Sequence, residues 1–386
     1  MADFPLAGLK VLDFTRVVAG PYATRMLSDL GADVLKVEPP EGDVTRKLGN
    51  PGEGVSGYYL QQNIGKRNIC IDLKAAGARE LILKLAAEAD IVTENFRPGV
   101  MDKFGIGWEE LSRGNPRLTI SGYGQTSPNR KKAAYAPVLH AETGLIARQA
   151  EIADSNPADI QLSVADSYSS LHGIIAILAA LRVRDQSGEG QHIDLAMISV
   201  LHSVDDYAYW ALDDDWPKPE ENTVWEAPEG RRILITGNMK WMWKMFATRD
   251  GLADPTPDGA DIATKVQMRR EAMIKHMLNH ESFDALTTTL DRLNLAWGEV
   301  QPFNAEIYEQ PSVKALGVIV DVIDDAGNAR RTVQSPYRFS KSKSGLDSDA
   351  RTAKRGEHNV TALQDWLDMD DEEIRALSEN KALISQ

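Results

Sequence analysis

Apolar and polar positions alternate in short blocks between residues 8 and 124. Apolar runs of strand length are separated by segments where apolar residues recur at the helical period, such as 21–32 and 75–89. The runs expected to form strands are 8–14, 33–38, 66–73, 90–96 and 117–124. Strands alternating with helices are typical of βαβ units, so the pattern predicts an α/β fold with a mostly parallel sheet. Ligands of such sheets bind at the carboxyl ends of the strands.

The helical period returns in a long apolar stretch, "SSLHGIIAILAAL", and later breaks. Residues 166–184 are predicted to form a long helix, with a strand at 191–197 and a helix at 199–212. Residues 213–230, "DDDWPKPEENTVWEAPEG", are acidic and contain proline, which indicates a linker.

A chain of 386 residues is long enough for two domains. We expect a large domain at 1–212 and, after the linker at 213–230, a smaller α+β domain at 231–337. Residues 338–386 contain a polar connector and a last amphipathic helix.

Composition narrows the class of protein. Hydrophobic residues make up 42% and charged residues 26%, as in soluble globular proteins. The net charge of −14 argues against a nucleic-acid partner, because phosphate binding needs a basic surface. No apolar run reaches the roughly 20 residues that span a bilayer, and the first residues lack a signal-peptide pattern, so no membrane partner is expected. The single cysteine, Cys70, excludes an intrachain disulfide and favours a cytoplasmic location.

Several common chemistries leave no mark in the chain. The turn after the first strand lacks the glycine spacing of dinucleotide-binding folds, and neither a Walker loop nor a G-x-S-x-G elbow occurs. His276 and His280 have a metal-like spacing, but no third ligand accompanies them. An exposed helix face explains the pair more simply, so no metal is expected.

Asp166 is a single carboxylate at the start of the long apolar helix. On the residues alone, it is most simply a helix N-cap, whose side chain accepts a backbone N–H. The sharper hypothesis is a nucleophile. At its ordinary pKa of about 3.9 an aspartate is fully ionised at neutral pH, so it would need no separate base.

An ordered set of motifs resembles the class III CoA-transferases, also called the CaiB/BaiF family. The motifs are "GLKVLDFTRVVAGPYATRMLSDLGADVLKVEPPEGDVTR", "NIGKRNICIDLK", "ADIVTENFRPGVMDKFGI", "VADSYSSLHGIIAILAALRVRDQSGEGQHIDLAM", "SVKALG", "QSPYRFS" and "GEHN". The family contains CoA-transferases and 2-methylacyl-CoA racemases. The resemblance implies a Rossmann-like large domain, a C-terminal segment that returns to it, and two chains interlocked as a homodimer.

The resemblance also implies a mechanism. Asp166 aligns with the family's nucleophilic aspartate, which attacks an acyl-CoA thioester to form an acyl–aspartyl anhydride. CoA is then passed to a free carboxylic acid, with no permanently bound cofactor. The positions expected to bind CoA are Arg16, Val17, Ala19, Leu73, Lys74, Asn95, Phe96, Arg97 and Lys103. Val18 replaces a glutamine of some transferases, which argues against oxalate-type specificity.

Residues 135–145 bear on the choice of reaction. Family racemases begin this segment with a His–Asp acid/base pair, where this chain has Tyr135 and Ala136. His140 either faces the active site with Glu142 or is a satisfied core histidine. Two rivals to the transferase remain: a 2-methylacyl-CoA racemase that uses Asp166 with His140, and an acyl-CoA-binding protein without turnover.

Overall fold

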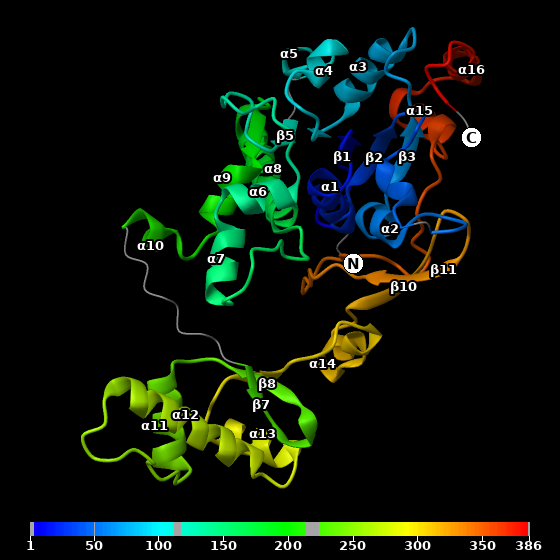
Figure 1. Ribbon diagram of the computed structural model, residues 1–386. Coiled ribbons are helices and arrows are strands. Elements are labelled where there is room, and N and C mark those ends of the chain that lie inside the picture. The colour runs from blue at the N-terminus through cyan, green and yellow to red at the C-terminus, as the bar shows by residue number, and fades with distance from the viewer. Residues whose placement is uncertain (1–3, 50, 112–116, 214–223, 385–386) are drawn as a thin grey trace. The chain divides into compact units, whose positions relative to one another are not determined.

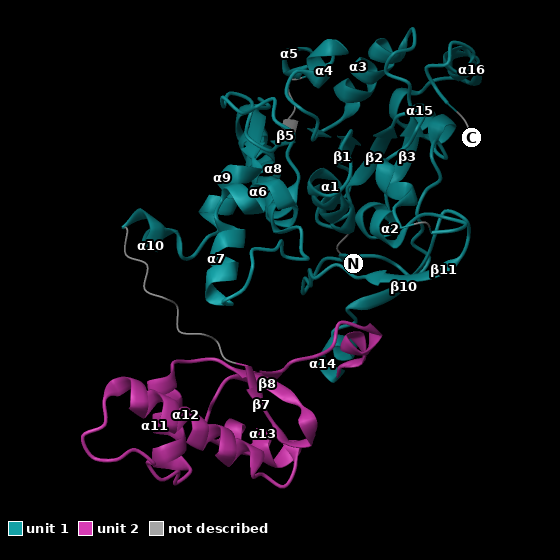
Figure 2. Ribbon diagram, in the orientation of Figure 1, with its two compact units in different colours: residues 1–214, 311–386 teal, residues 215–310 magenta. Residues whose placement is uncertain are grey.

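The computed structural model describes residues 4–49, 51–111, 117–213 and 224–384. The chain divides into two compact units, shown in teal and magenta in Figure 2. Unit 1 comprises residues 1–214 and 311–386, and unit 2 comprises residues 215–310.

Unit 1 is built on a six-stranded sheet in the order β3-β2-β1-β4-β5-β6. The strands are β1 (Lys10–Asp13), β2 (Asp33–Glu38), β3 (Arg67–Cys70), β4 (Ile91–Glu94), β5 (Arg117–Ser121) and β6 (His192–Ala196). Every neighbouring pair is parallel, which confirms the predicted sheet. The chain moves outward from β1 in one direction and from β4 in the other, so a ligand crevice is expected where these two strands end.

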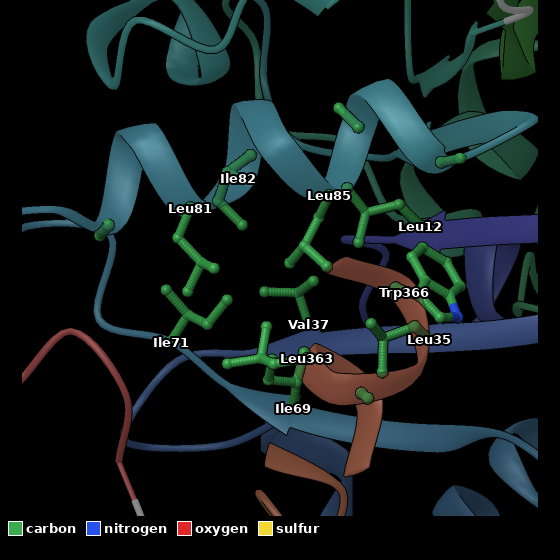
Figure 3. Close-up of a cluster of buried hydrophobic side chains, with 14 of the residues drawn as sticks. Leu12, Leu35, Val37, Ile69, Ile71, Leu81, Ile82, Leu85, Leu363 and Trp366 are labelled. Atoms are coloured by element: carbon green, nitrogen blue, oxygen red, sulfur yellow. The ribbon is translucent and has the colours of Figure 1, made fainter. Parts of the chain in front are cut away.

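Helices cover both faces of this sheet (Figure 1). Those of unit 1 are α1 (Ala19–Asp29), α2 (Gly57–Asn63), α3 (Ala78–Glu88), α4 (Val100–Lys103), α5 (Trp108–Leu111), α6 (Ala136–Glu142), α7 (Leu145–Ile152), α8 (Val164–Ser187), α9 (Met197–Ser203), α10 (Ala208–Leu212), α14 (Pro311–Ala315), α15 (Asn359–Leu367) and α16 (Asp371–Glu379), with a 3-10 turn η1 (Val44–Lys47). Because strand side chains alternate between faces, Leu12 packs toward α3 and α15, and the neighbouring Val11 toward α1 and α8. Figure 3 shows the first of these clusters.

Helix α8 is long and apolar enough to span a membrane by length and composition alone, the one such helix in the part of the chain described. It packs on α1, α6 and α9 and on strands β5 and β6. Such packing is that of a core helix. The outer face of α8 still exposes Leu171, Ile175 and Leu178.

The C-terminal part of the chain packs within unit 1. Leu363 and Trp366 of α15 join the cluster under α3, and the Trp366 indole donates to the Asp33 carboxylate at 2.8 Å. The hairpin of β10 (Ile319–Ile323) and β11 (Ala329–Val333) also belongs to unit 1. Its Val322 is buried against Tyr59 and other residues of α2. This packing puts residues 311–337 in unit 1, whereas the sequence pattern placed them in the small domain.

Unit 2 is a small α+β body. Strands β7 (Val224–Glu226), β8 (Arg232–Ile235) and β9 (Trp297–Glu299) form an antiparallel sheet, packed against α11 (Met239–Arg249), α12 (Ile262–Leu278) and α13 (Phe283–Arg292), with 3-10 turns η2 (Pro228–Gly230) and η3 (Ala305–Glu309). The end of the expected linker is therefore structured, because Trp225 is buried in this core. The rest of that linker, after Asp213, lies outside the described residues.

The candidate metal pair lies in unit 2. His276 bonds the Asp250 carboxylate at 2.5 Å, and His280 contacts the hydroxyl of Thr289 at 3.1 Å. Among the residues that the structure describes, no group of three or more His, Cys, Asp or Glu side chains could hold a metal ion.

Candidate active site

A cavity of about 360 Å³ opens in unit 1 at the carboxyl ends of β1, β4, β5 and β6. Its wall is formed by Arg16, Val17, Ala19, Val44, Asn95, Phe96, Arg97, Pro98, Ile120, Ser121, Gly122, Arg130, Lys132, Ala133, Ala134, Tyr135, Asp166 and Met197. The cavity thus lies where the strand order of a doubly wound sheet favours a ligand.

The carboxylate of Asp166 lies where three helices begin. Asp166 is the third residue of α8, and the N-cap position belongs to Ser163, whose side chain makes no capping bond. The Asp166 carboxylate instead faces the backbone N–H groups of Ala19, at the start of α1, and Ala136, at the start of α6. Helix N-termini carry partial positive charge, which stabilises an anion placed there. Asp166 therefore does not cap its own helix, as the residues alone suggested, but holds the ends of two others.

Burial has the larger effect on this carboxyl group. It raises the pKa of Asp166 to about 6, although His140 and the two N–H groups act in the opposite direction. The ordinary aspartate pKa assumed from sequence is therefore wrong here. Asp166 remains mostly ionised at pH 7, but as a less solvated and more basic carboxylate than a surface aspartate.

Most of the residues expected to bind CoA surround the same cavity. Six of them lie in its wall together with Asp166: Arg16, Val17, Ala19, Asn95, Phe96 and Arg97. The other three, Leu73, Lys74 and Lys103, lie outside it. Lys74 and Lys103 are exposed, while Leu73 packs at the edge of the cluster under α3.

Asn95 has a structural role that the sequence did not suggest. Its side-chain oxygen accepts the Arg16 N–H at 2.8 Å, and its NH₂ group donates to the Arg16 carbonyl at 2.8 Å. The amide therefore ties the loop after β4 to the loop after β1, and both of its ends are occupied.

Sequence reasoning missed cationic and aromatic groups at this site. Arg130 and Lys132, from the loop after β5, line the cavity. Lys132 is paired with Glu142, whereas the guanidinium groups of Arg16, Arg97 and Arg130 form no ion pair with any described residue. The run "NRKK" after a predicted strand was the available signal.

Tyr58, on α2, is an aromatic group near Asp166. Burial and then the charge of Asp166 raise the pKa of its hydroxyl. Tyr58 belongs to the stretch "GVSGY", which lacks the G-x-S-x-G spacing of a hydrolase elbow, so no signal in the sequence indicated it.

His140 has both ring nitrogens engaged. Its Nδ1 bonds the Asp159 carboxylate at 2.8 Å, and its Nε2 accepts the Ala165 N–H at 3.2 Å. The ring is fully buried and absent from the cavity wall, as a satisfied core histidine would be. Glu142 does not join it, because its carboxylate bonds Lys132 and the hydroxyl of Tyr123 at 2.6 Å.

Comparison with known proteins gives a consistent result. The family model for CoA-transferase family III matches residues 6–359. The succinate–glutarate CoA-transferase of Agrobacterium fabrum is 31% identical over 93% of this chain and 95% of its own length. The succinyl-CoA:mesaconate CoA-transferase of Haloarcula hispanica is 30% identical over 87% of this chain and 90% of its own length.

A solved structure agrees with these relatives. A CaiB/BaiF family protein from Brucella suis superposes with a TM-score of 0.78 at 30% identity, covering 94% of this chain and all of that one. The mixed α/β architecture is thus that of known family members. With the family model matched over nearly the whole chain, the protein belongs to CoA-transferase family III.

Proposed function

We propose that this protein transfers CoA from an acyl-CoA thioester to a free carboxylic acid, with Asp166 as the nucleophile. The Asp166 carboxylate attacks the thioester carbonyl, forming an acyl–aspartyl anhydride and releasing the CoA thiolate. The thiolate attacks the aspartyl carbonyl, which gives an aspartyl–CoA thioester and the first free acid. The carboxylate of the second acid attacks that thioester, which forms a new acyl–aspartyl anhydride and releases the CoA thiolate. The thiolate then attacks the acyl carbonyl of this anhydride, which gives the new acyl-CoA and regenerates the Asp166 carboxylate. Each step conserves the energy of the thioester, so no nucleotide is consumed.

The observation that carries the proposal is the position of Asp166. Its carboxylate is partly desolvated, yet it is held by two helix N-termini in the wall of a cavity that also contains Arg16 and Arg97. Desolvation makes a carboxylate a better nucleophile than it is in water. The N–H groups of Ala19 and Ala136 face the Asp166 carboxyl group, so they would stabilise the oxyanion that forms on the aspartyl carbon when the CoA thiolate attacks the anhydride.

Two groups of charged side chains would bind the two substrates separately. Arg16, Arg97 and the outlying lysines suit the phosphates of CoA, because guanidinium and ammonium groups bind phosphate well. Arg130, whose guanidinium forms no ion pair with any described residue, suits a second carboxylate on the acid. The relatives named for succinate, glutarate and mesaconate act on such dianions. The proposed acceptor is therefore a short dicarboxylic acid.

The racemase alternative has less support. A racemase needs a second group that exchanges a proton with the α-carbon. His140 accepts the Ala165 N–H on Nε2, so that nitrogen is unavailable as a base without breaking the start of α8. In heavy water without an acceptor acid, the protein should not exchange the α-hydrogen of a 2-methylacyl-CoA.

A donor–acceptor assay tests the proposal. Purified protein is mixed with succinyl-CoA and either glutarate, mesaconate or propionate, and new thioesters are measured by mass spectrometry. We expect CoA thioesters of the dicarboxylic acids, and Asp166→Asn should lower their rate of formation at least about 1,000-fold. Asp185→Asn is the matched control, since it changes an exposed carboxylate of the same helix. Equal activity in both variants, or no new thioester with any acid, would reject the proposal.

The assembly is proposed on separate grounds. The chain leaves unit 1 at residue 214 and returns to it at residue 311, as an interlocked pair of chains requires. The apolar outer face of α8 offers a surface for a second copy. Light scattering should give twice the chain mass of 42.5 kDa, and a mass of one chain would contradict the dimer. A reducing cytoplasm, expected from the single cysteine of the sequence, Cys70, stays a prediction.

A further inference from the structure

The loop between β1 and α1 contains an unusual backbone conformation. Val17 has a φ of 67°, in the left-handed region that β-branched residues rarely occupy. Such a conformation persists only when surrounding contacts enforce it, and it often marks a functional loop. Val17 lies two residues before Ala19, whose N–H faces the Asp166 carboxylate.

A buried ion pair holds this loop from below. Asp43 accepts the Val17 N–H on its Oδ2 atom at 3.2 Å, and Lys36 donates to the Thr15 carbonyl at 2.6 Å. The Lys36 ammonium lies 3.3 Å from the same Asp43 oxygen, and both side chains are at most 1% exposed. The pair thus forms hydrogen bonds to the backbone on both sides of Arg16, although neither residue lines the cavity.

Hydrogen bonds also hold the end of this loop next to α1. Ser170 of α8 donates to the Ala19 carbonyl at 2.6 Å, and Asn95 holds both backbone groups of Arg16. The left-handed residue lies between these fixed points. If Val17 relaxed to an ordinary φ, the direction of the following N–H groups would change.

We propose that Asp43 and Lys36 are positioning residues, whose buried ion pair keeps Val17 in the left-handed conformation and thereby aims the Ala19 N–H at Asp166. The catalytic consequence rests on the proposed function, but the geometric claim does not. The alternative is an ion pair that only stabilises the fold.

The protonation of Asp166 provides a readout that needs no transferase activity. A carbodiimide reacts with protonated carboxyl groups, so the pH dependence of amine coupling to Asp166, read by peptide mass spectrometry, reports its titration. We expect Asp43→Asn to raise the midpoint by about half a pH unit, because Asp166 loses a hydrogen bond to its charged form. Simple removal of the Asp43 charge would lower the midpoint, so the direction distinguishes the two effects.

A double-mutant cycle tests the role of Val17. Glycine adopts positive φ without strain, so Val17→Gly removes the need for enforcement. We expect Asp43→Asn to lower kcat about 10-fold in the native background, and less than about 3-fold in the Val17→Gly background. Asp43→Asn should change the KM for acyl-CoA little in either the native or the Val17→Gly background.

Asp29→Asn is the control for a general loss of stability. Asp29 is also buried, with Arg25 as its cationic partner at 2.6 Å, but it lies at the far end of α1. Its substitution should leave the midpoint of Asp166 unchanged. If Asp43→Asn does not fold, Asn95→Ala loosens the turn from its other side and should raise the same midpoint.

The outcomes separate the two proposals. The positioning role would be overturned if the labelling midpoint of Asp166 were unchanged or lowered in a folded Asp43→Asn variant. If Asp43→Asn does not fold, the same result in Asn95→Ala would overturn it. So would equal effects of Asp43→Asn in the two backgrounds. Absence of transferase activity in the native protein would instead reject the proposed function, while the labelling midpoints would still decide the positioning role.

Discussion

Ser170 and Asp166, one helical turn apart on α8, face the two polar backbone atoms of the same residue. The Ser170 hydroxyl donates to the Ala19 carbonyl at 2.6 Å, and the Asp166 carboxylate faces the Ala19 N–H. Helix α8 and the start of α1 are thereby fixed to each other at the point where the proposed chemistry takes place. The same contact joins Asp166, the proposed nucleophile, to the loop that surrounds it.

Ser170→Ala should weaken this connection. We expect a loss of about 1 kcal/mol in the free energy of unfolding, measured with urea, because one buried hydrogen bond is removed. The turnover number should also fall several-fold. The adjacent Ser169→Ala is the control: Ser169 is equally buried but its hydroxyl has no hydrogen-bond partner among the described residues. A larger effect at Ser169 than at Ser170 would contradict the account.

Transferase activity should rise with pH through the pKa of Asp166. The carboxylate is the attacking form, and burial raises that pKa to about 6. The acid limb of kcat/KM should therefore have its midpoint near pH 6, and the neighbouring Tyr58 hydroxyl, whose pKa is raised, does not titrate in that range. A midpoint near pH 4 would show that Asp166 is solvated like a surface aspartate.

The same raised pKa predicts a cost to stability. The folded pKa of Asp166 is above the unfolded value of 3.8, so its ionisation destabilises the fold, increasingly from about pH 4 and fully above the folded pKa. Asp166→Asn removes this penalty. Its stability relative to the native protein should rise by about 2 kcal/mol between pH 4 and pH 7, allowing for partial exposure. Denaturant titrations at both pH values measure this, and a difference independent of pH would refute it.

Much of this fold could be predicted from the alternation of apolar blocks. The parallel sheet follows from the strands of residues 8–124, and the long helix from its apolar period. The unit to which the hairpin around Val322 belongs could not be predicted, because its packing on Tyr59 joins residues far apart in the chain. Local patterns contain no such information, which is why residues 311–337 were placed in the wrong unit by the sequence pattern.

The site divides in the same way. The Asp166 position and six positions expected to bind CoA came from ordered motifs and lie around one cavity. The raised pKa of Asp166 depends on burial by distant elements, and the engagement of His140 depends on Asp159 and Ala165. Spacing along the chain specifies neither of these. Arg130 was missed because a basic run on a loop is ordinarily solvated surface.

Arg130 provides the test of acceptor class. Arg130→Ala should raise the KM for glutarate about 10-fold and leave the KM for the acyl-CoA donor nearly unchanged, because a charged hydrogen bond to the second carboxylate is lost. Monocarboxylic acceptors should be unaffected. Lys131→Ala, an exposed neighbour outside the cavity wall, is the control. A rise in the donor KM instead would assign Arg130 to CoA.

The most direct test of the central claim is covalent capture at Asp166. The protein is incubated with an acyl-CoA and hydroxylamine, which intercepts anhydrides and thioesters, and its peptides are then mapped by mass spectrometry. We predict a hydroxamate on Asp166, dependent on the acyl-CoA and absent from Asp185. An Asp166 that stays unmodified while CoA transfer proceeds would contradict the account.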